Sequence, residues 1–512
     1  MAFTRASGVL LHPTSLPGRY GVGDLGEWAY RFVDYLVEAK QSLWQVLPLG
    51  PTSYGDSPYQ ALSSFAGNTL LISIDQLVED GWLLPDEVAT TLPEFSATHV
   101  DYGTVIDYHN GMLATAYERF KANPGKSERE FSAFRHGNRA WLDDFALFMT
   151  LKTVHEGRPW VEWESALALY QPAAIAAAHA QYADLVEQYA FRQWQFFKQW
   201  FALKSYANNM GIRFIGDAPI FVAHDSSDVW GNQKLFYLDK QGNPTVIAGV
   251  PPDYFSADGQ RWVNPHYRWD RMAKDGYGWW IARLKAILSM VDVLRIDHFR
   301  GFEAYWEVAA SETTARNGRW VKGPGSAFFK VVNAALGGLP IIAEDLGVIT
   351  PEVEAMRDDA GLPGMKVLQF AWGEISAENP FLPFNHVPNS VVYSGTHDNN
   401  TTVGWWKDEK EATPAMKDHI ARFVGHPVEE PHWEMIRFAQ ASVAHTAVVP
   451  MQDLLGLDEH SRMNTPGRES GNWGWRMTAD DFEHSAKARL ADLTELYGRT
   501  PSEKKLEDDD ES

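Results

Sequence analysis

Four short apolar runs in this chain each end in an acidic residue, and this feature limits the fold more than any other. The runs are RFIGD at residues 213–217, VLRID at 293–297, IIAE at 341–344 and VVYSGTHD at 391–398. In a β-barrel, the carboxyl ends of separate parallel strands surround one cavity, where barrel enzymes place their catalytic residues. We therefore expect a carboxylate active site at the mouth of a barrel.

Eight runs of Val, Ile and Leu have the near-continuous apolar character of parallel strands that are covered on both faces. They lie at residues 9–11, 43–47, 213–216, 291–296, 340–343, 365–371, 391–394 and 447–451. Amphipathic helical patterns follow at residues 27–40, 189–210, 278–290 and 326–336, and a further helix is predicted to begin at Thr350-Pro351 and to stop at Gly361. The sequence thus predicts an α/β fold, a (β/α)8 TIM barrel.

The spacing between the predicted strands is uneven, so we expect a single catalytic barrel over residues 1–498 that carries large, mostly helical insertions. The insertions are predicted at about 50–190, 226–275 and 400–446. Helical patterns at residues 141–155 and 175–189 fall in the first insertion, whereas the second is rich in Gly, Pro and aromatic residues. Residues 499–512 are acidic, and we expect a disordered tail there.

Charge and cysteine content exclude several classes of function. The net charge is −22, which argues against nucleic acid or an anionic membrane as a partner. The chain has no cysteine, hence no disulfide, thiolate nucleophile or Cys-ligated zinc, and this fits a cytoplasmic location. No signal peptide is expected at the N-terminus, and no apolar stretch reaches the roughly 20 residues that span a bilayer.

Two cofactor hypotheses compete with a carboxylate site. Residues 21–26, GVGDLG, match the dinucleotide pattern GxGxxG, but prolines separate them from the preceding strand, and the next strand ends without an acid to hold a ribose. We interpret these glycines as turn residues. His298 and His397 adjoin acids, but neighbouring side chains on a strand point apart, and the sequence has no HExxH motif or EF-hand loop. We expect neither a metal nor a cofactor.

The acids at the strand ends suit the cleavage of a glycosidic bond. That reaction needs one carboxyl that holds a proton and one ionised carboxylate. Arg295 lies two residues before Asp297 on the same face of a strand and is expected to hold Asp297 ionised. Glu344 follows an apolar run and suits the protonated role, while Asp398 could bind sugar hydroxyls. Any one of these acids could instead cap a helix, and Asp217 is the weakest candidate on chemistry alone.

Aromatic residues in predicted loops indicate a sugar substrate, because sugar rings stack their C–H faces on aromatic side chains. These residues are Tyr54, Tyr59, Tyr254, Phe255, Trp262, Tyr267, Trp269, Trp473 and Trp475. Core packing is the alternative for each one. Their density in irregular segments favours a glycan groove.

A set of motifs in fixed order carries a family resemblance over residues 8–476. The motifs are GVLLHPTSLPGRYGVGDLG at 8–26, GDSPYQ at 55–60, FIGDAPIFVAHDSSDVW at 214–230, GVPPDYFSADGQRW at 249–262, LRIDHFRG at 294–301, AEDLG at 343–347, SGTHDN at 394–399 and RMNTPGRESGNWGWR at 462–476. With them the chain resembles the 4-α-glucanotransferases of glycoside hydrolase family 77, the amylomaltases or disproportionating enzymes. The resemblance implies that Asp297 is the nucleophile, Glu344 the general acid/base and Asp398 the stabiliser of the transition state.

The resemblance also implies a set of substrate contacts. These are Tyr59, Asp217, Gln260, Trp262, Arg295, His298, His397, Asn464, Pro466 and Gly467. It implies transfer of α-1,4-glucan segments, from maltooligosaccharides, amylose, starch or glycogen, to the 4-hydroxyl of another glucan or of glucose, with cycloamyloses as possible products. A glucan hydrolase would share every catalytic residue and is the alternative, whereas a non-catalytic glycan-binding protein would be expected to lack Asp297 or Glu344.

The chain departs from the family pattern at three positions. Val263 stands where the family has a glycine in WGNP, Asn400 where it has the last aspartate of GTHDND, and Gly474 where it has the first arginine of GNWRWR. A β-branched residue at 263 is expected to stiffen the loop, which affects the preferred chain length and cyclisation.

Overall fold

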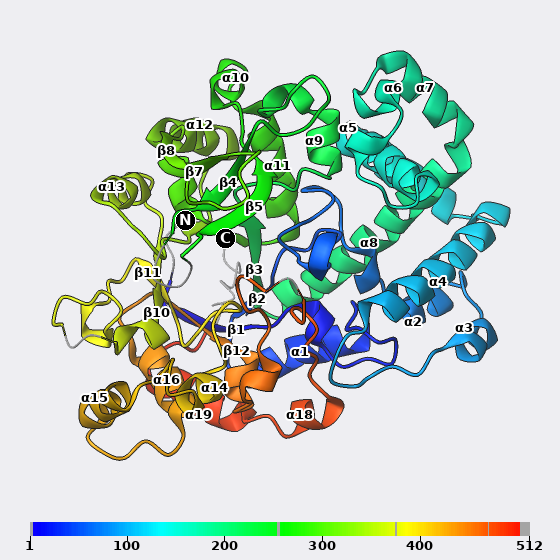
Figure 1. Ribbon diagram of the computed structural model, residues 1–512. Coiled ribbons are helices and arrows are strands. Elements are labelled where there is room, and N and C mark those ends of the chain that lie inside the picture. The colour runs from blue at the N-terminus through cyan, green and yellow to red at the C-terminus, as the bar shows by residue number, and fades with distance from the viewer. Residues whose placement is uncertain (1–3, 253–256, 374–375, 469, 502–512) are drawn as a thin grey trace, which may run out of the picture.

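The computed structural model describes residues 4–252, 257–373, 376–468 and 470–501, and an eight-stranded parallel sheet lies at its centre (Figure 1). The strands are β1 (Ala6–Leu10), β2 (Leu43–Gln45), β3 (Arg213–Pro219), β6 (Val293–Asp297), β9 (Ile341–Ala343), β10 (Gly364–Val367), β11 (Ser390–Tyr393) and β12 (Thr446–Pro450). Their spatial order follows the sequence, and β12 pairs with β1. Each predicted strand overlaps one of them, so the barrel prediction is confirmed.

One seam of this barrel is not closed by a strand ladder. Between β9 and β10, the backbone N–H of Ala343 donates to the carbonyl of Pro363 over 2.9 Å. The N–H of Met365 donates instead to a side chain, Oδ1 of Asp345, over 2.7 Å. These two hydrogen bonds join the edges of the sheet and close the barrel.

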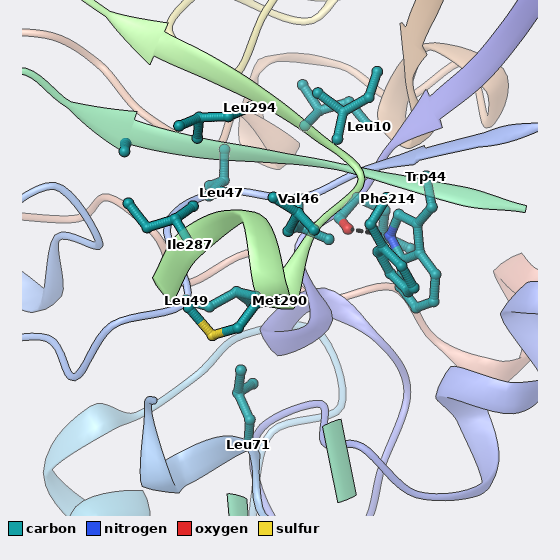
Figure 2. Packing of buried hydrophobic residues seen from close by; sticks show 14 of the residues in the cluster. Leu10, Trp44, Val46, Leu47, Leu49, Leu71, Phe214, Ile287, Met290 and Leu294 are labelled. Carbon is teal, nitrogen blue, oxygen red and sulfur yellow. Dashed lines mark hydrogen bonds between the residues drawn. The ribbon is translucent and has the colours of Figure 1, made fainter. Parts of the chain in front are cut away.

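Alternate residues of the strands point to opposite sides of the barrel wall. On the outer side, Trp44 and Phe214 lie with ring centroids 5.0 Å apart (Figure 2). They pack against Phe32 of α1 (Glu27–Glu38) and Trp200 of α8 (Ala183–Asn209). On the inner side, the Tyr393 hydroxyl donates to Gln45 Oε1 across the barrel over 2.9 Å. The inner side thus carries polar side chains among apolar ones such as Leu10, which lies opposite Gln45, and it leads towards the acids at the strand ends.

Helices surround the barrel at most of the predicted places. Those next to strands are α1, α8, α11 (Gly278–Met290), α12 (Ser326–Leu336), α13 (Pro351–Asp359), α16 (Pro431–Ala441) and α19 (Lys487–Leu496). Helix α13 begins at Pro351 as predicted and is followed by Gly361 at φ 67°, although Thr350 makes no side-chain cap hydrogen bond. None of the helices in the described part of the chain is both long and apolar enough to cross a membrane.

A helical segment fills the interval between β2 and β3 and lies to one side of the barrel in Figure 1. It contains α2 (Ile74–Glu79), α3 (Pro85–Thr91), α4 (Tyr102–Ala122), α5 (Ser127–Val154), α6 (Ser165–Ala168), α7 (Pro172–Gln181) and α8. The helix predicted at residues 175–189 is wrong as one element, because the chain leaves the helical conformation at Tyr182, where φ is −112° and ψ is 25°. The helix predicted from 141 begins earlier, at Ser127.

A second sheet was not predicted. It is antiparallel, with the order β5-β4-β7-β8. Its strands are β4 (Val246–Val250), β5 (Gln260–Pro265), β7 (Ala304–Ala309) and β8 (Arg319–Lys322), with the short helices α9 (Ser227–Gly231) and α10 (Trp269–Lys274) nearby in sequence. The central pair, β4 with β7, joins segments that are distant in sequence. No local pattern signals such a pairing.

The glycines of residues 21–26 are explained by close packing. A Cβ on Gly23 would lie 2.1 Å from the carbonyl oxygen of Pro13, and Gly21 has φ of +80°. Asp24 Oδ1 accepts a hydrogen bond from the N–H of Gly26 over 2.8 Å, directly before α1. The glycines and Asp24 thus shape the turn that leads into α1.

The C-terminal part of the chain packs around β12. Helices α14 (Thr402–Lys407) and α15 (Pro414–Val424) precede α16, while α17 (Met451–Leu454) and α18 (Ala479–Glu483) precede α19. The expectation that a disordered tail starts at 499 is wrong at Arg499, which is 0% exposed and donates hydrogen bonds to the carbonyls of Ala6 and Gln440 among others. From residue 502 onwards, the predicted tail lies outside the described residues.

Candidate active site

The predicted acids lie at the carboxyl ends of four barrel strands. Asp297 is the last residue of β6, and Asp217 lies near the end of β3. Glu344 directly follows β9, and Asp398 lies in the loop after β11. Because these strands are parallel members of one barrel, their carboxyl ends open on the same side.

Arg295 connects two of these acids inside the barrel. Strands β3 and β6 pair in a register that sets Asp217 opposite Arg295. The guanidinium of Arg295 donates to Asp217 Oδ2 over 2.7 Å and to Asp297 Oδ1 over 3.2 Å. The side chains of Arg295 and Asp217 are 3% and 0% exposed, whereas that of Asp297 is 27% exposed. Asp297 is therefore the member of this cluster that a substrate can reach.

The expected effect of Arg295 on Asp297 needs a correction. Burial raises the pKa of Asp297 above its usual value, and Arg295 only partly offsets this rise. Burial likewise raises the pKa of Asp217 against the opposing charge of Arg295. Arg295 thus opposes the protonation of both carboxyls, but burial outweighs its effect on either pKa.

Glu344 is held by two backbone N–H groups. His298 donates to Oε2 over 2.7 Å, and Leu346 donates to Oε1 over 2.9 Å. His298 reaches this position because its backbone is in the left-handed region, with φ of 53°. Burial, with a further contribution from the charge of Asp297, raises the pKa of Glu344 to about 8. This shift favours the protonated form of Glu344, which is the form expected of it from the sequence.

Asp398 belongs to a third group of polar side chains. Asn464 Nδ2 donates to Asp398 Oδ1 over 2.6 Å, and His397 Nε2 lies 3.4 Å from Asp398 Oδ2. Tyr59 lies between this group and the Arg295 cluster. Its hydroxyl is 2.9 Å from Asp217 Oδ2 and 2.9 Å from His397 Nε2.

Aromatic rings form two walls of the site. The ring of Trp473 lies 5.8 Å from Tyr59 and 6.1 Å from His397, measured between centroids. Trp262 stands edge to face with His298 at 4.9 Å, and its indole N–H donates to Gln260 Oε1 over 3.0 Å. His298 Nε2 is buried and has no hydrogen-bond partner among the described residues.

Some predicted residues are not brought to this cluster. Pro466 and Gly467 are exposed in the loop after Asn464. Tyr267, Trp269 and Trp475 are buried at 0%, 9% and 7% exposure, so their assignment to a glycan groove is wrong and they serve as core residues. Tyr254 and Phe255 lie outside the described residues.

Sequence reasoning did not single out Arg462. Its guanidinium donates to the carbonyl of Asp398 and to the carbonyl of Asn464, each over 2.7 Å, and lies 3.5 Å from Glu411. Its position two residues before Asn464 was the available signal. In the described part of the chain, no group of three or more His, Asp or Glu side chains is arranged to hold a metal ion.

Comparison with known proteins gives consistent matches over the whole fold. The model of glycoside hydrolase family 77, described as 4-alpha-glucanotransferase, matches residues 11–481. The chain is 50% identical to a 4-alpha-glucanotransferase of Thermus thermophilus, covering 97% of this chain and 100% of that protein. It is 48% identical to one of Synechocystis sp., covering 97% and 98%.

Solved structures agree with this match. An amylomaltase from Streptococcus agalactiae in complex with acarbose superposes with a TM-score of 0.94 at 40% identity, covering 97% of this chain and 100% of that one. An amylomaltase from Corynebacterium glutamicum shares the fold, with a TM-score of 0.78 at 19% identity, covering 96% of this chain and 75% of that one.

Proposed function

The chain belongs to the 4-α-glucanotransferases of glycoside hydrolase family 77, and on that premise we propose that Asp297, Glu344 and Asp398 carry out the transfer. The observation that supports these roles is the contrast between two neighbouring carboxyls. Glu344 holds a proton up to about pH 8, whereas Asp297 lies beside the guanidinium of Arg295 and is partly open to the cavity. An acid and a nucleophile in one site are what glycosyl transfer with retention requires.

In the first step, Glu344 protonates the glycosidic oxygen of an α-1,4 bond while Asp297 attacks C1. The bond from C1 to the leaving oxygen breaks, a covalent glycosyl–Asp297 ester forms, and the reducing-end fragment leaves with the proton. Two backbone N–H groups orient the Glu344 carboxyl for this transfer. The positive charge of Arg295 favours the carboxylate form of Asp297 against the effect of burial.

In the second step, the 4-hydroxyl of another glucan or of glucose attacks C1. Glu344, now ionised, takes the proton of that hydroxyl, and Asp297 leaves as a carboxylate. Asp398, oriented by Asn464, accepts hydrogen bonds from ring hydroxyls of the distorted sugar and stabilises the positive charge that develops on the ring.

Transfer is faster than hydrolysis when a bound acceptor excludes water from the glycosyl–Asp297 ester. Trp262 and Tyr59 are partly exposed and offer apolar faces on which sugar rings stack, while Trp473, which is 6% exposed, packs behind Tyr59. We propose that α-1,4-glucans, namely maltooligosaccharides, amylose, starch or glycogen, bind across these walls. The amylomaltase of Streptococcus agalactiae was solved with acarbose, which fits a glucan-binding cleft in this family.

The test uses maltotriose with the EDTA-treated protein and resolves the products by size. We expect a ladder of longer maltooligosaccharides together with glucose, and loss of both in Asp297→Asn. Asp228→Asn is a matched control, because Asp228 is a buried carboxylate that accepts the N–H of Ser64 and contacts no proposed catalytic residue. Release of glucose and maltose alone would make the protein a hydrolase, and an unchanged Asp297→Asn would refute the assignment of the nucleophile.

A further inference from the structure

Asp345, the residue after the proposed general acid, points away from the active site. It is 8% exposed, and its carboxylate lies in the seam between β9 and β10. Oδ1 accepts the N–H of Met365, the position that a strand ladder would otherwise satisfy, over 2.7 Å. The space is tight, since a Cβ on Gly364 would lie 2.2 Å from Oδ2. Asp345 is thus fixed from the β10 side.

A cation from a neighbouring helix completes this anchor. Arg357 of α13 donates to Oδ2 of Asp345, and its side chain is 17% exposed. A buried carboxylate without a cation beside it would destabilise the fold. The ion pair with Arg357 avoids this cost and joins α13, β10 and the end of β9. Three elements therefore meet at one side chain.

The same residue lies in the middle of the turn that holds Glu344. The Glu344 carboxyl folds back to accept the N–H of Leu346, so the peptide units on both sides of Asp345 determine the geometry of this hydrogen bond. The second donor, the N–H of His298, belongs to the residue directly after β6 and does not depend on the turn. A shift of the turn would therefore move Glu344 relative to one of its two donors.

We propose that Asp345 is a positioning residue for the general acid Glu344. The side-chain hydrogen bond across the seam and the ion pair with Arg357 fix the turn of residues 344–346, and the turn fixes the direction of the Glu344 carboxyl. The inference rests on the proposed role of Glu344. It adds that barrel closure and acid catalysis depend on the same carboxylate.

The test separates acid catalysis from the remaining machinery by the choice of donor. Maltotriose needs protonation of its leaving oxygen, whereas α-maltosyl fluoride releases fluoride without it. We expect Asp345→Ala to lower kcat on maltotriose about 100-fold, the size of effect that a small misplacement of a catalytic group produces. The first-turnover rate of fluoride release should stay at the wild-type value. Asp345→Asn, which keeps an acceptor for Met365, should recover part of the loss.

The pH dependence of kcat/KM provides a second measurement, which would not change if Asp345 only stabilised the fold. The Leu346 hydrogen bond and Arg295 lower the pKa of Glu344, whereas burial and Asp297 raise it. Loss of the Leu346 contact in Asp345→Ala should move the basic limb of kcat/KM to higher pH. Arg357 and Lys366 are the charged groups that face Asp345 itself, and both stay in place in this variant.

Two comparisons decide the result. Glu344→Gln should show the same contrast between donors, and if it cleaves maltotriose normally, the proposed function fails rather than this inference. Suppose that Glu344→Gln shows the contrast but that Asp345→Ala lowers the rates on maltotriose and on α-maltosyl fluoride equally, or lowers neither. Asp345 is then not a positioning residue for Glu344. Asp228→Ala serves as the control for loss of a buried carboxylate and should leave both rates unchanged per folded enzyme.

Discussion

Arg295 donates a hydrogen bond to Asp217 over 2.7 Å, and the two side chains are 3% and 0% exposed. The contact joins neighbouring strands directly beneath Asp297, because β3 and β6 pair at these residues. Breaking a buried ion pair by removing one partner is costly, since the other charge stays buried without compensation. The pair therefore links the stability of the barrel to the state of the nucleophile.

Replacing Arg295 with methionine should affect stability and catalysis together. We expect Arg295→Met to lower the free energy of unfolding by about 3–5 kcal/mol, measured by urea unfolding. Arg295 opposes the protonation of Asp297, so its loss should raise the pKa of Asp297 further. The acidic limb of kcat/KM would then move to higher pH. If the variant is destabilised but the acidic limb of its kcat/KM profile does not move, Arg295 does not control the protonation of Asp297.

The dependence of activity on pH should follow the two carboxyls. Glu344 must carry a proton in the first step, so with a pKa of about 8 its contribution is present below that pH and is lost above it. Asp297 must be ionised, so activity falls as the pH drops through its raised pKa. We expect a bell-shaped profile of kcat/KM whose limbs belong to the coupled pair. A basic limb near pH 5 would show that Glu344 is not the acid.

The sequence was informative where chemistry follows from position along a strand. An apolar run that ends in an acid predicts both a parallel strand and a carboxylate at its end, and this holds for Asp297 and for Glu344. The place of Arg295 beside Asp297 follows from the alternation of side chains in the same way. The raised pKa of Asp297 could not be predicted in this way, because it depends on burial and on the charge of Asp398, which comes from a distant loop.

Features that depend on contacts between distant segments could not be read from the chain. The pairing of β4 with β7 is one. The contacts of Tyr59 with both Asp217 and His397 are another, although the loop aromatics and the family resemblance both indicated the residue. Aromatic density was misleading for Tyr267 and Trp475, since the same residue type serves a groove and a core. Arg499 lies just after α19 with no apolar pattern around it, yet it is fully buried.

Val263 has a strained backbone beside Trp262. Its φ is 58°, and its side chain is 49% exposed. The left-handed region costs a non-glycine residue about 1–2 kcal/mol, and glycine carries an entropy cost of about 0.5–1 kcal/mol. Val263→Gly should therefore raise the free energy of unfolding by up to about 1 kcal/mol. A looser Trp262 would also admit water, so the ratio of hydrolysis to transfer should rise.

The control for this change is Val443→Gly. Val443 is 54% exposed, and its backbone lies outside the left-handed region. With no strain to relieve, this substitution should lower the free energy of unfolding by about 0.5–1 kcal/mol. If both variants shift in the same direction, the strain at Val263 does not matter for stability.

Arg499 should be essential for the C-terminal half of the fold. Its guanidinium donates to the carbonyls of Ala6, Gln440, Ser442 and Ala444, which tie β1 to the segment before β12. We expect Arg499→Gln to lower the free energy of unfolding by about 3–5 kcal/mol, since several buried carbonyls lose charged donors. Arg316→Gln removes an arginine that is 58% exposed and should cost less than about 1 kcal/mol.

Substitutions of Asn464 test whether this residue orients Asp398. Its amide donates to Asp398 Oδ1 over 2.6 Å, while Arg462 holds the carbonyls of both residues. Asn464→Asp keeps the shape but sets two carboxylates against each other, so Asp398 should turn away from the sugar. We expect kcat on maltotriose to fall about 100-fold, with a smaller loss in Asn464→Ala, which removes the donor without adding charge. Folding should be little affected, because Arg462 stays in place, and near-ultraviolet circular dichroism can check this. Equal losses in the two variants would mean that Asn464 acts by contacting the glucan rather than by orienting Asp398.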